Sequence, residues 1–228
     1  MTHSDQRLSA LGVVHGCSTT EDGDMKDPAL RARLLSSVGA NPDRLLCLKQ
    51  THSDIIVHAA DEAAALGLRN SPYPEADAWI LSASGWGAAI FTADCVPVLI
   101  WDASASMLGA AHAGWRGAAK KLPAKTAARM LELGAKAPLR AWIGPHIRPC
   151  CFEVGPELRE HFPAQAFSER QGKIYLDLEL SIRVQLQEAG LDDSDIRSAG
   201  LCTHCGENLF SYRKNPHCGR LMTYIFKK

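Results

Sequence analysis

The sequence lacks three features that would place the chain in a broad functional class. Lys plus Arg and Asp plus Glu number 25 each, so no excess charge would attract the chain to nucleic acid or anionic lipid. No apolar run reaches bilayer length, because Asp94 and Asp102 interrupt the most hydrophobic stretch. The segment Met1–Arg7 does not show the basic and then apolar profile of a signal peptide. We therefore expect a cytoplasmic protein that acts on a small molecule, without a nucleic-acid or membrane partner.

Cysteine, in contrast, is more frequent than in an average cytosolic chain. Eight cysteines occur among 228 residues. Without an export signal these thiols should stay reduced, which favours metal binding or catalysis over a disulfide framework. The apolar share of 46% is sufficient for a sizeable core.

Short apolar runs alternate with amphipathic segments along the chain. We expect strands at 45–48, 55–58, 78–81, 88–93, 96–101, 107–111, 139–143 and 220–226. We expect helices at 31–37, 123–134, 156–162 and 177–189. The strand at 107–111 should end in a turn formed by Gly114 and Gly117. With no repeat or linker, residues 1–228 are predicted to form a single α+β domain with mixed β-sheets packed against helices.

Three separated segments each place one metal ligand beside small residues. These ligands are His52, Cys95 and His112, spaced too widely for a local metal-binding motif. Two imidazoles and a thiolate suit a borderline cation such as zinc, and three protein ligands leave a position open for water or substrate. Each residue follows or ends a predicted strand, where loops can converge. Separate packing roles remain the alternative, with Cys95 in the core and His52 in a turn.

The candidate ligands belong to longer motifs that follow one another along the chain. The motifs are 49–52 (KQTH), 76–78 (ADA), 92–99 (TADCVPVL), 112–117 (HAGWRG), 143–147 (IGPHI), 150–155 (CCFEVG), 210–213 (FSYR) and 219–220 (GR). Together they resemble the polyphenol-oxidase (laccase-like) domain family, of the purine nucleoside phosphorylase and peptidoglycan-editing factor type. The resemblance extends from about His15 to the C-terminus.

This resemblance implies one zinc held by His52, Cys95 and His112. It implies phosphorolysis of adenosine, inosine and S-methyl-5'-thioadenosine with phosphate, and hydrolytic deamination of adenosine. A second possibility is an amide hydrolase that edits peptidoglycan precursors with Cys95 as nucleophile. A copper-dependent polyphenol oxidase ranks lower, because a single three-ligand site lacks the copper cluster that reduces oxygen to water.

Two residues near the ligands are further catalytic candidates. Asp94 could act as a general acid or base, or could accept a hydrogen bond from a ligand imidazole, provided that the strand ends there. Arg116 could bind phosphate with its planar guanidinium, or could instead pair with a surface carboxylate.

Four residues are candidates for substrate binding. Gln50 and Thr51 could orient substrate or satisfy backbone groups of the turn. Trp115 could stack on a purine ring or belong to the core. His146, after the turn at Gly144, is a candidate at the edge of the site.

A competing metal site involves the C-terminal cysteines. Cys202, Cys205, His217 and Cys218 have ligand types that suit a structural zinc, and would indicate a zinc-stabilised binding module. Cys150 and Cys151 are interpreted as packing thiols. Tyr212 and Arg213 could line the pocket or brace the core.

The chain departs from the family pattern near its N-terminus. Residues 17–20 run almost directly into Asp27 and Pro28, where relatives carry a longer loop. This predicts that part of the pocket wall is missing, which makes the substrate less certain than the metal.

Overall fold

A computed structural model describes residues 4–227 of the chain. Residues 1–3, part of the segment Met1–Arg7 considered above, and residue 228 lie outside the described residues. The strands are β1 (Val14–Cys17), β2 (Leu45–Leu46), β3 (Ile56–Ala59), β4 (Ala78–Leu81), β5 (Gly87–Thr92), β6 (Val96–Trp101), β7 (Leu108–Ala113), β8 (Arg140–Ile143), β9 (Glu153–Val154), β10 (Phe167–Arg170), β11 (Lys173–Leu176), β12 (Ile196–Ser198) and β13 (Leu221–Phe226). The α-helices are α1 (Gln6–Ala10), α2 (Pro28–Ser37), α3 (Glu62–Arg69), α4 (Trp115–Ala119), α5 (Leu122–Glu132) and α6 (Leu178–Glu188).

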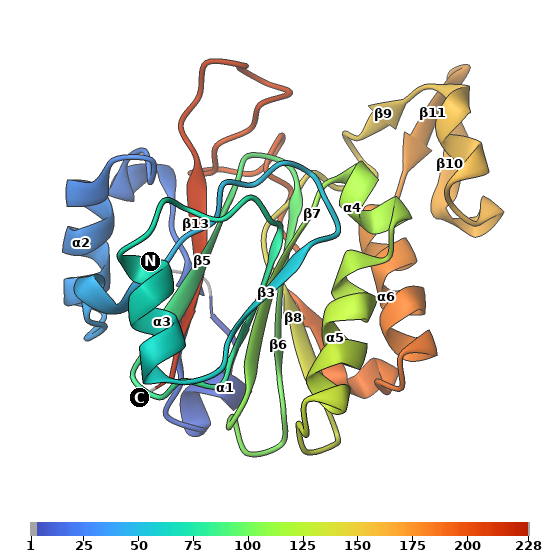
Figure 1. Ribbon diagram of the computed structural model, residues 1–228. Helices are drawn as coiled ribbons and strands as arrows, with labels where there is room; N and C mark the ends of the chain where they lie inside the picture. The colour runs from blue at the N-terminus through green and yellow to red at the C-terminus, as the bar shows by residue number, and fades with distance from the viewer. Residues whose placement is uncertain (1–3, 228) are drawn as a thin grey trace.

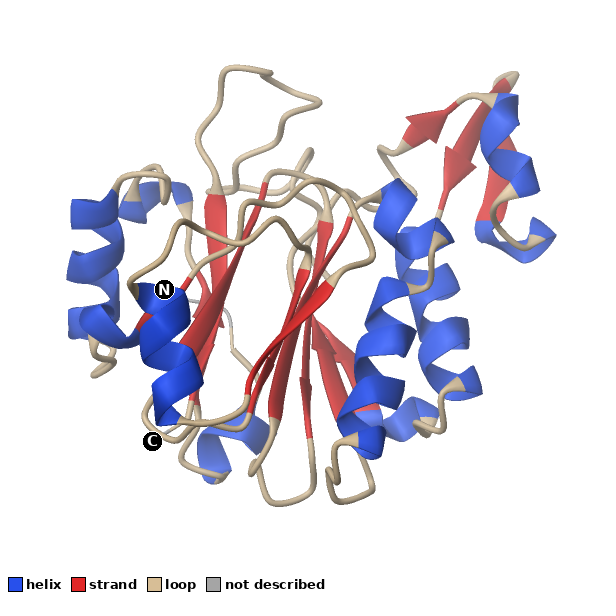
Figure 2. Ribbon diagram, in the orientation of Figure 1, coloured by secondary structure: helices blue, strands red, loops and turns tan. Residues whose placement is uncertain are grey.

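Within residues 4–227 the strands form three sheets. A six-stranded sheet has the order β12-β8-β6-β7-β4-β3, and a four-stranded sheet has the order β1-β13-β5-β2. A small sheet, β10-β11-β9, stands apart at the upper right of Figure 1. The two large sheets lie face to face, with α5 and α6 outside the larger one and α2 outside the smaller one (Figures 1 and 2).

Alternation of side chains along the central strands explains these layers. In β6, Leu99 and Trp101 belong to the cluster between the sheets, whereas Val98 and Ile100 pack in the cluster that contains the apolar faces of α5 and α6. In β5, Ile90 points into the space between the sheets and Ala89 toward the α2 side. Strands that are buried on both faces are apolar along their whole length, as the sequence of β6 is.

Local signals fix the ends of the main helices. The Asp177 carboxylate accepts a hydrogen bond from the Leu180 amide (2.9 Å) at the start of α6, and Pro123 occupies the first turn of α5. After α5, Gly134 adopts φ +93°, a conformation that glycine reaches without strain. Among the described residues, no helix is long and apolar enough to cross a membrane.

The predicted α+β class with mixed sheets is confirmed, and most predicted strands lie within two residues of their positions. Two details were wrong. β7 continues through His112 and Ala113, because its antiparallel pairing with β6 extends to Val96. Gly114 begins α4 and Gly117 lies inside this helix, so the two glycines do not form a turn.

The segment predicted as a helix at 156–162 also differs. It forms a short 3-10 helix, Pro156–Glu160, which ends before the predicted boundary. The short elements α1, β1, α3 and β9 to β12 were not predicted from the sequence.

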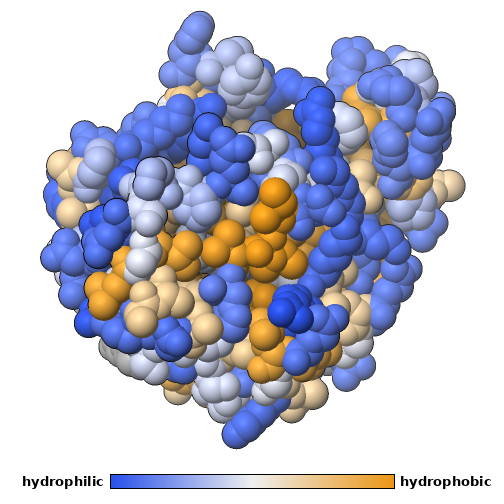
Figure 3. Space-filling model, in the orientation of Figure 1, coloured by the Kyte–Doolittle hydropathy of each residue, from blue (hydrophilic) through white to orange (hydrophobic). Residues whose placement is uncertain are grey.

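The half-exposed edge strand β3 borders one face of the molecule. Figure 3 shows apolar surface gathered in the middle of this face, between α3 and α5. The loops that carry the candidate ligands lie at the upper end of the sheets in Figure 1, away from this apolar surface. The turn between β5 and β6 connects the two large sheets directly, so it lies where their ends meet.

Candidate metal centre

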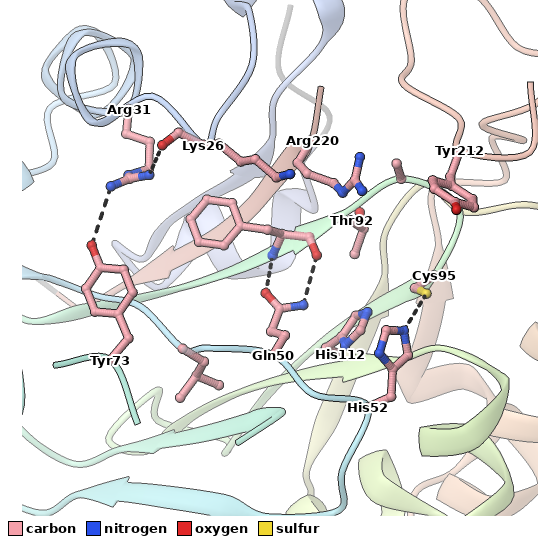
Figure 4. A pocket seen from close by; sticks show the side chains of 13 residues that line it. Lys26, Arg31, Gln50, His52, Tyr73, Thr92, Cys95, His112, Tyr212 and Arg220 are labelled. Atoms are coloured by element: carbon pink, nitrogen blue, oxygen red, sulfur yellow. Dashed lines mark hydrogen bonds between the residues drawn. The ribbon is translucent and has the colours of Figure 1, made fainter. Parts of the chain in front are cut away.

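The structure brings His52, Cys95 and His112 together. Their donor atoms lie within 4.8 Å of one another, and the Cys95 Sγ is 3.8 Å from the His52 Nε2 (Figure 4). The two imidazole rings are 4.9 Å apart and nearly perpendicular, at 70°. A thiol and two imidazoles in this arrangement could hold a metal ion and leave one coordination position open toward the pocket.

Each ligand comes from a different part of the fold. His112 lies near the end of β7, and Cys95 lies in the turn between β5 and β6. His52 belongs to the loop between β2 and β3 and has a positive φ of 60°. A non-glycine residue in this region is uncommon and requires support from surrounding contacts.

Asp77, at the start of β4, supplies this support. Its buried carboxylate accepts hydrogen bonds from the His112 Nδ1 (2.8 Å), the His52 amide (3.1 Å), the Ser53 amide (2.6 Å), the Ser53 hydroxyl (2.7 Å) and the Thr51 amide (3.2 Å). Because the His112 Nδ1 donates to Asp77, the Nε2 keeps its lone pair for a metal. One carboxylate therefore orients a ligand imidazole and holds the loop of a second ligand.

Asp77 lies within the 76–78 motif, but its role was not predicted from the sequence. The available signal was an acidic residue at the head of the apolar run 78–81. A carboxylate beside an apolar strand is expected to be buried, and a buried charge is costly unless several hydrogen-bond donors surround it.

Ionisation of the three central groups is strongly linked. Burial opposes a charge on Cys95, but the neighbouring His112 and His52 lower the pKa of the thiol to about 6. Burial disfavours protonated His112, yet Cys95 and Asp77 raise its pKa to about 9. Burial would raise the pKa of Asp77, but hydrogen bonds from His112 and Ser53 hold it well below its usual range. Without a metal, these shifts favour a Cys95 thiolate and an Asp77 carboxylate on either side of a protonated His112. A metal cation can replace the proton on His112 and bind to the thiolate.

Gly114 leaves room for this centre. A Cβ atom at this position would lie 2.9 Å from both the Cys95 Sγ and the His52 Cδ2. Cβ atoms essentially never make contacts this short, so α4 can begin beside the ligands only because its N-cap residue, Gly114, has no side chain. This close approach is a structural reason for glycine in the 112–117 motif.

The three ligands open into a pocket of about 540 Å³ (Figure 4). The lining residues are Lys26, Arg31, Leu48, Gln50, His52, Tyr73, Phe91, Thr92, Ala93, Cys95, His112, Tyr212 and Arg220. Three are basic, and no acidic side chain among the described residues lines the pocket. This volume is typical of pockets that bind small organic ligands.

The short N-terminal segment, which was expected to leave part of the pocket wall missing, contributes two residues to the pocket lining. Lys26 and Arg31 come from this segment and from α2. Arg31 is held by hydrogen bonds to the carbonyls of Met25 (2.9 Å) and Lys26 (3.0 Å) and lies over the Phe91 ring. The short connection therefore leaves two cations at the pocket.

Gln50 lines the pocket, but its amide is fully used by the backbone. Its Nε2 donates to the Phe91 carbonyl (2.9 Å) and its Oε1 accepts from the Phe91 amide (2.8 Å), which attaches the His52 loop to β5. Thr51 is exposed and bonded to Asp77, outside the pocket lining. The hydrogen bonds of both residues hold the loop that carries His52 in place.

Asp94 faces away from the metal ligands. Its carboxylate accepts hydrogen bonds from the Thr203 hydroxyl (2.6 Å) and the Arg213 amide (2.7 Å) of the C-terminal loop. The positive φ of Asp94 (94°) marks the end of the strand, and Cys95 on its other side turns toward the histidines. Asp94 therefore connects the metal centre to the C-terminal loop.

Arg116, Trp115 and His146 do not line the pocket. The Arg116 guanidinium lies 4.4 Å from the centre of the Trp115 ring, which itself stacks on His161 at 6.0 Å. His146 is completely buried, with its Nδ1 2.9 Å from the Gly144 carbonyl. These three residues therefore lie outside the pocket lining, and the Lys and Arg side chains that line the pocket are Lys26, Arg31 and Arg220.

The structure does not bring together the four residues Cys202, Cys205, His217 and Cys218, which were considered as a competing zinc site. The structure groups Cys202 and Cys205 with Cys150 and Cys151, which had been interpreted as packing thiols. His217 and Cys218 are not part of this group, and the Cys218 thiol instead lies beside the Arg220 guanidinium, at 3.9 Å. Tyr212 lines the pocket, as one of its two predicted roles required.

Comparison with known proteins agrees with this geometry. A purine nucleoside phosphorylase of Clostridium acetobutylicum is 34% identical over 191 residues, which cover 79% of this chain and 76% of the relative. A purine nucleoside phosphorylase of Escherichia coli is 32% identical over 93% of both chains. An adenosine deaminase from an unknown prokaryotic organism is 28% identical over 96% of this chain and 89% of its own.

Solved structures share the fold. The hypothetical protein YfiH of Bacillus licheniformis superposes with a TM-score of 0.85 at 26% identity, over 95% of this chain and 93% of that one. YlmD of Geobacillus stearothermophilus gives a TM-score of 0.83 at 27% identity, over 95% and 92%. Residues 17–228 match the model of the family described as multi-copper polyphenol oxidoreductase laccase, and the chain belongs to this family.

Proposed function

We propose that the chain is a zinc-dependent purine nucleoside enzyme that acts in the cytoplasm. It would carry out phosphorolysis of adenosine, inosine and S-methyl-5'-thioadenosine, and hydrolytic deamination of adenosine. The observation that carries the proposal is a candidate three-ligand metal centre that opens into a pocket lined by Lys26, Arg31 and Arg220 and, within residues 4–227, by no acidic side chain. The names of the relatives, purine nucleoside phosphorylase and adenosine deaminase, support the same substrate class.

The residues present fit a zinc ion. His52, Cys95 and His112 would hold it, with Gly114 leaving the necessary space and Asp77 fixing the His112 tautomer. When bound, zinc supplies a Lewis acid at an open coordination position. One such centre has too few ligands for a multi-copper cluster, which favours zinc over copper as the native ion.

The basic residues provide a site for phosphate. Lys26 and Arg220 both line the pocket, and no ion-pair partner of the Lys26 ammonium occurs among residues 4–227. In Figure 4 the two cationic groups extend toward the same region of the pocket. An unpaired ammonium and a guanidinium that line the same pocket favour a dianionic ligand through charge-assisted hydrogen bonds. The rings of Phe91 and Tyr212 offer flat apolar surface for the purine base.

The test is turnover of adenosine by the zinc-loaded protein, with and without phosphate. Phosphorolysis gives adenine and ribose 1-phosphate only when phosphate is present, whereas deamination gives inosine in either case. Chromatography separates the products. A zinc-loaded protein that converts neither adenosine nor S-methyl-5'-thioadenosine would overturn the proposal.

Lys26→Ala separates the two reactions. We expect the KM for phosphate to rise by about tenfold or more, as loss of a charge-assisted hydrogen bond implies. Deamination, which needs no phosphate, should be unchanged. Lys173→Ala is the matched control, because Lys173 is exposed on β11 and pairs with Glu153 outside the pocket. An equal loss of both reactions in Lys26→Ala would contradict the phosphate role.

A second candidate function rests on the arrangement of Asp77, His112 and Cys95. The Asp77 carboxylate is hydrogen-bonded to the His112 imidazole, which in turn neighbours the Cys95 thiol and lowers its pKa. A nucleophilic cysteine and its general base have this arrangement. An amide hydrolase of this kind would act on peptidoglycan precursors without a metal. Amide hydrolysis that survives chelation and is lost in Cys95→Ser would favour it over the nucleoside reaction.

A further inference from the structure

Four cysteines from two distant segments meet outside the candidate metal centre. Cys150 and Cys151 follow β8, and Cys202 and Cys205 follow β12. β8 and β12 are parallel neighbours, so the chain leaves both strands at the same edge of the sheet. The four Sγ atoms lie within 4.8 Å of one another, and none is in a disulfide.

The spacing of these sulfurs suits a tetrahedral ion. Four sulfurs about 2.3 Å from a tetrahedrally coordinated zinc lie about 3.8 Å from one another. The Cys150 Sγ is 3.7 Å from the Cys205 Sγ, and no separation in the group exceeds 4.8 Å. Adjustment of side-chain rotamers by less than an ångström or so would complete the arrangement. Four thiolates select zinc among the common divalent cations.

The backbone around Cys202 is organised to support a thiolate. The Arg148 amide points at the Cys202 Sγ (3.5 Å), and the Gly206 amide donates to the Cys202 carbonyl (2.8 Å), which closes a tight turn over Cys205. A Cβ atom at Gly206 would overlap this carbonyl oxygen, so the turn requires glycine.

We propose that Cys150, Cys151, Cys202 and Cys205 bind a second zinc ion, which has a structural role. Four protein ligands close the coordination sphere and leave no position for substrate. This site is separate from the candidate metal centre and does not depend on the function proposed for it.

Contacts of the loop show what the second ion would hold in place. Thr203, between the two C-terminal ligands, donates from its amide to the His146 carbonyl (2.9 Å) and from its hydroxyl to Asp94 (2.6 Å). Asp94 also accepts from the Arg213 amide, next to Tyr212 of the pocket wall. The zinc would therefore attach the C-terminal loop to the body of the protein, and so fix one wall of the pocket.

Metal analysis of the purified protein tests the proposal. Wild type should contain two zinc ions per chain, and Cys95→Ser should retain one. Cys205→Ser changes an exposed residue and should lose one ion, whereas Cys218→Ser, in the same loop but outside the group, should lose none. Addition of Cys205→Ser to Cys95→Ser should leave no zinc. If Cys95→Ser contains no zinc, the four-cysteine site is overturned whatever the fate of the nucleoside activity.

A second measurement keeps the test valid if Cys205→Ser does not fold. In wild-type protein, Cys150 and Cys205 are exposed and should nevertheless resist alkylation until a chelator is added. Mass spectrometry of peptides then reports each thiol, with Cys218 as the internal reference. Alkylation of Cys150 and Cys205 at the same rate before and after chelation, or a disulfide between them in the purified protein, would overturn the proposal.

Discussion

At the scale of single residues, Asp77 makes the contacts that position two of the three candidate ligands. Its carboxylate serves a ligand side chain and three consecutive backbone amides of the loop that carries another ligand. The partners are about 25 positions away in sequence, at 51–53, and 35 positions away at His112. Because these contacts are made only in the fold, the sequence indicated the three candidate ligands, which the structure brings together, but not the residue that orients them.

Asp77→Asn should reduce the zinc affinity of the centre by about 10- to 100-fold. The amide keeps the shape of the side chain but loses its charge, and its NH2 group cannot accept the backbone hydrogen bonds. Competition with a chromophoric chelator measures the dissociation constant. Asp54→Asn is the control, since Asp54 is in the same loop but pairs with Lys120 and Lys125 at the surface. Equal affinities in the two variants would contradict the role of Asp77.

Gly114→Ala should also impair the centre, for a steric reason. The added methyl group would overlap Cys95 and His52, so one ligand must move. We expect zinc occupancy of the centre to fall by at least half while the far-ultraviolet circular dichroism is retained. Gly12→Ala is unsuitable as a control because Gly12 has a positive φ, but Gly67→Ala on α3 meets no atom within 4 Å. Normal occupancy in Gly114→Ala would contradict the close approach.

At the scale of secondary-structure elements, continuous apolar runs predicted the central strands well. β4, β6 and β13 are buried throughout, so their sequences carry an unbroken apolar signal. β10 is half-buried or exposed at every position, and α3 buries a single residue, Ala65, within its bounds. β10 has too little apolar pattern to be predicted from the sequence, whereas α3 has a helical apolar periodicity close to that of α5 and was nevertheless not predicted.

The N-terminal helix α1 is attached through a histidine whose protonation should weaken the fold. His15 in β1 accepts a hydrogen bond at Nε2 from the Asp5 amide (2.7 Å), while its Nδ1 lies 3.2 Å from the Val13 carbonyl. Burial lowers the pKa of His15, against opposing contributions from the Val13 carbonyl and Asp5. The neutral ring is therefore the form that the folded state requires.

The free energy of unfolding should fall as the pH decreases below about 6.5, because the unfolded state then binds a proton that folded His15 excludes. The loss approaches about 1.4 kcal/mol per pH unit until the lowered folded pKa is reached. Above pH 7 this contribution is constant. Urea unfolding at pH 7 and pH 5 measures the change, and His15→Gln should show a smaller one. Identical pH dependence in both proteins would exclude His15 as the cause.

At the scale of the whole molecule, the sequence could not show which distant segments become neighbours. Cys150 and Cys205 are 55 positions apart and meet because β12 pairs in parallel with β8. The sequence instead suggested His217 and Cys218, which are closer along the chain but follow a different path. Likewise Arg116 was the expected phosphate ligand, whereas Lys26 from the N-terminal segment reaches the pocket. Metal ligands within family motifs were recognisable, but the surroundings of the pocket depend on tertiary topology.

Removal of metal should abolish activity and leave the fold in place. The apolar layers between and outside the two large sheets contain none of the three candidate ligands of the centre. Loss of each ion present at about 100 times its dissociation constant removes about 2.7 kcal/mol, or roughly 5–10 °C in Tm for a chain of this size, and a chelator that removes both proposed ions doubles the loss. Circular dichroism and calorimetry with and without a chelator measure both quantities. Complete unfolding on chelation would instead indicate that the core depends on metal.

The hydrogen bond between Thr203 and Asp94 attaches the C-terminal loop to the residue that precedes Cys95. The candidate ligands are held by the sheets and by Asp77, whereas Tyr212 and Arg220 of the pocket wall come from the C-terminal part of the chain. Exchange of residues 206–216 for those of a relative should therefore change substrate selectivity while it leaves Arg220 and the four cysteines in place. Homologues with different preferred nucleosides could have diverged by rewriting this one segment.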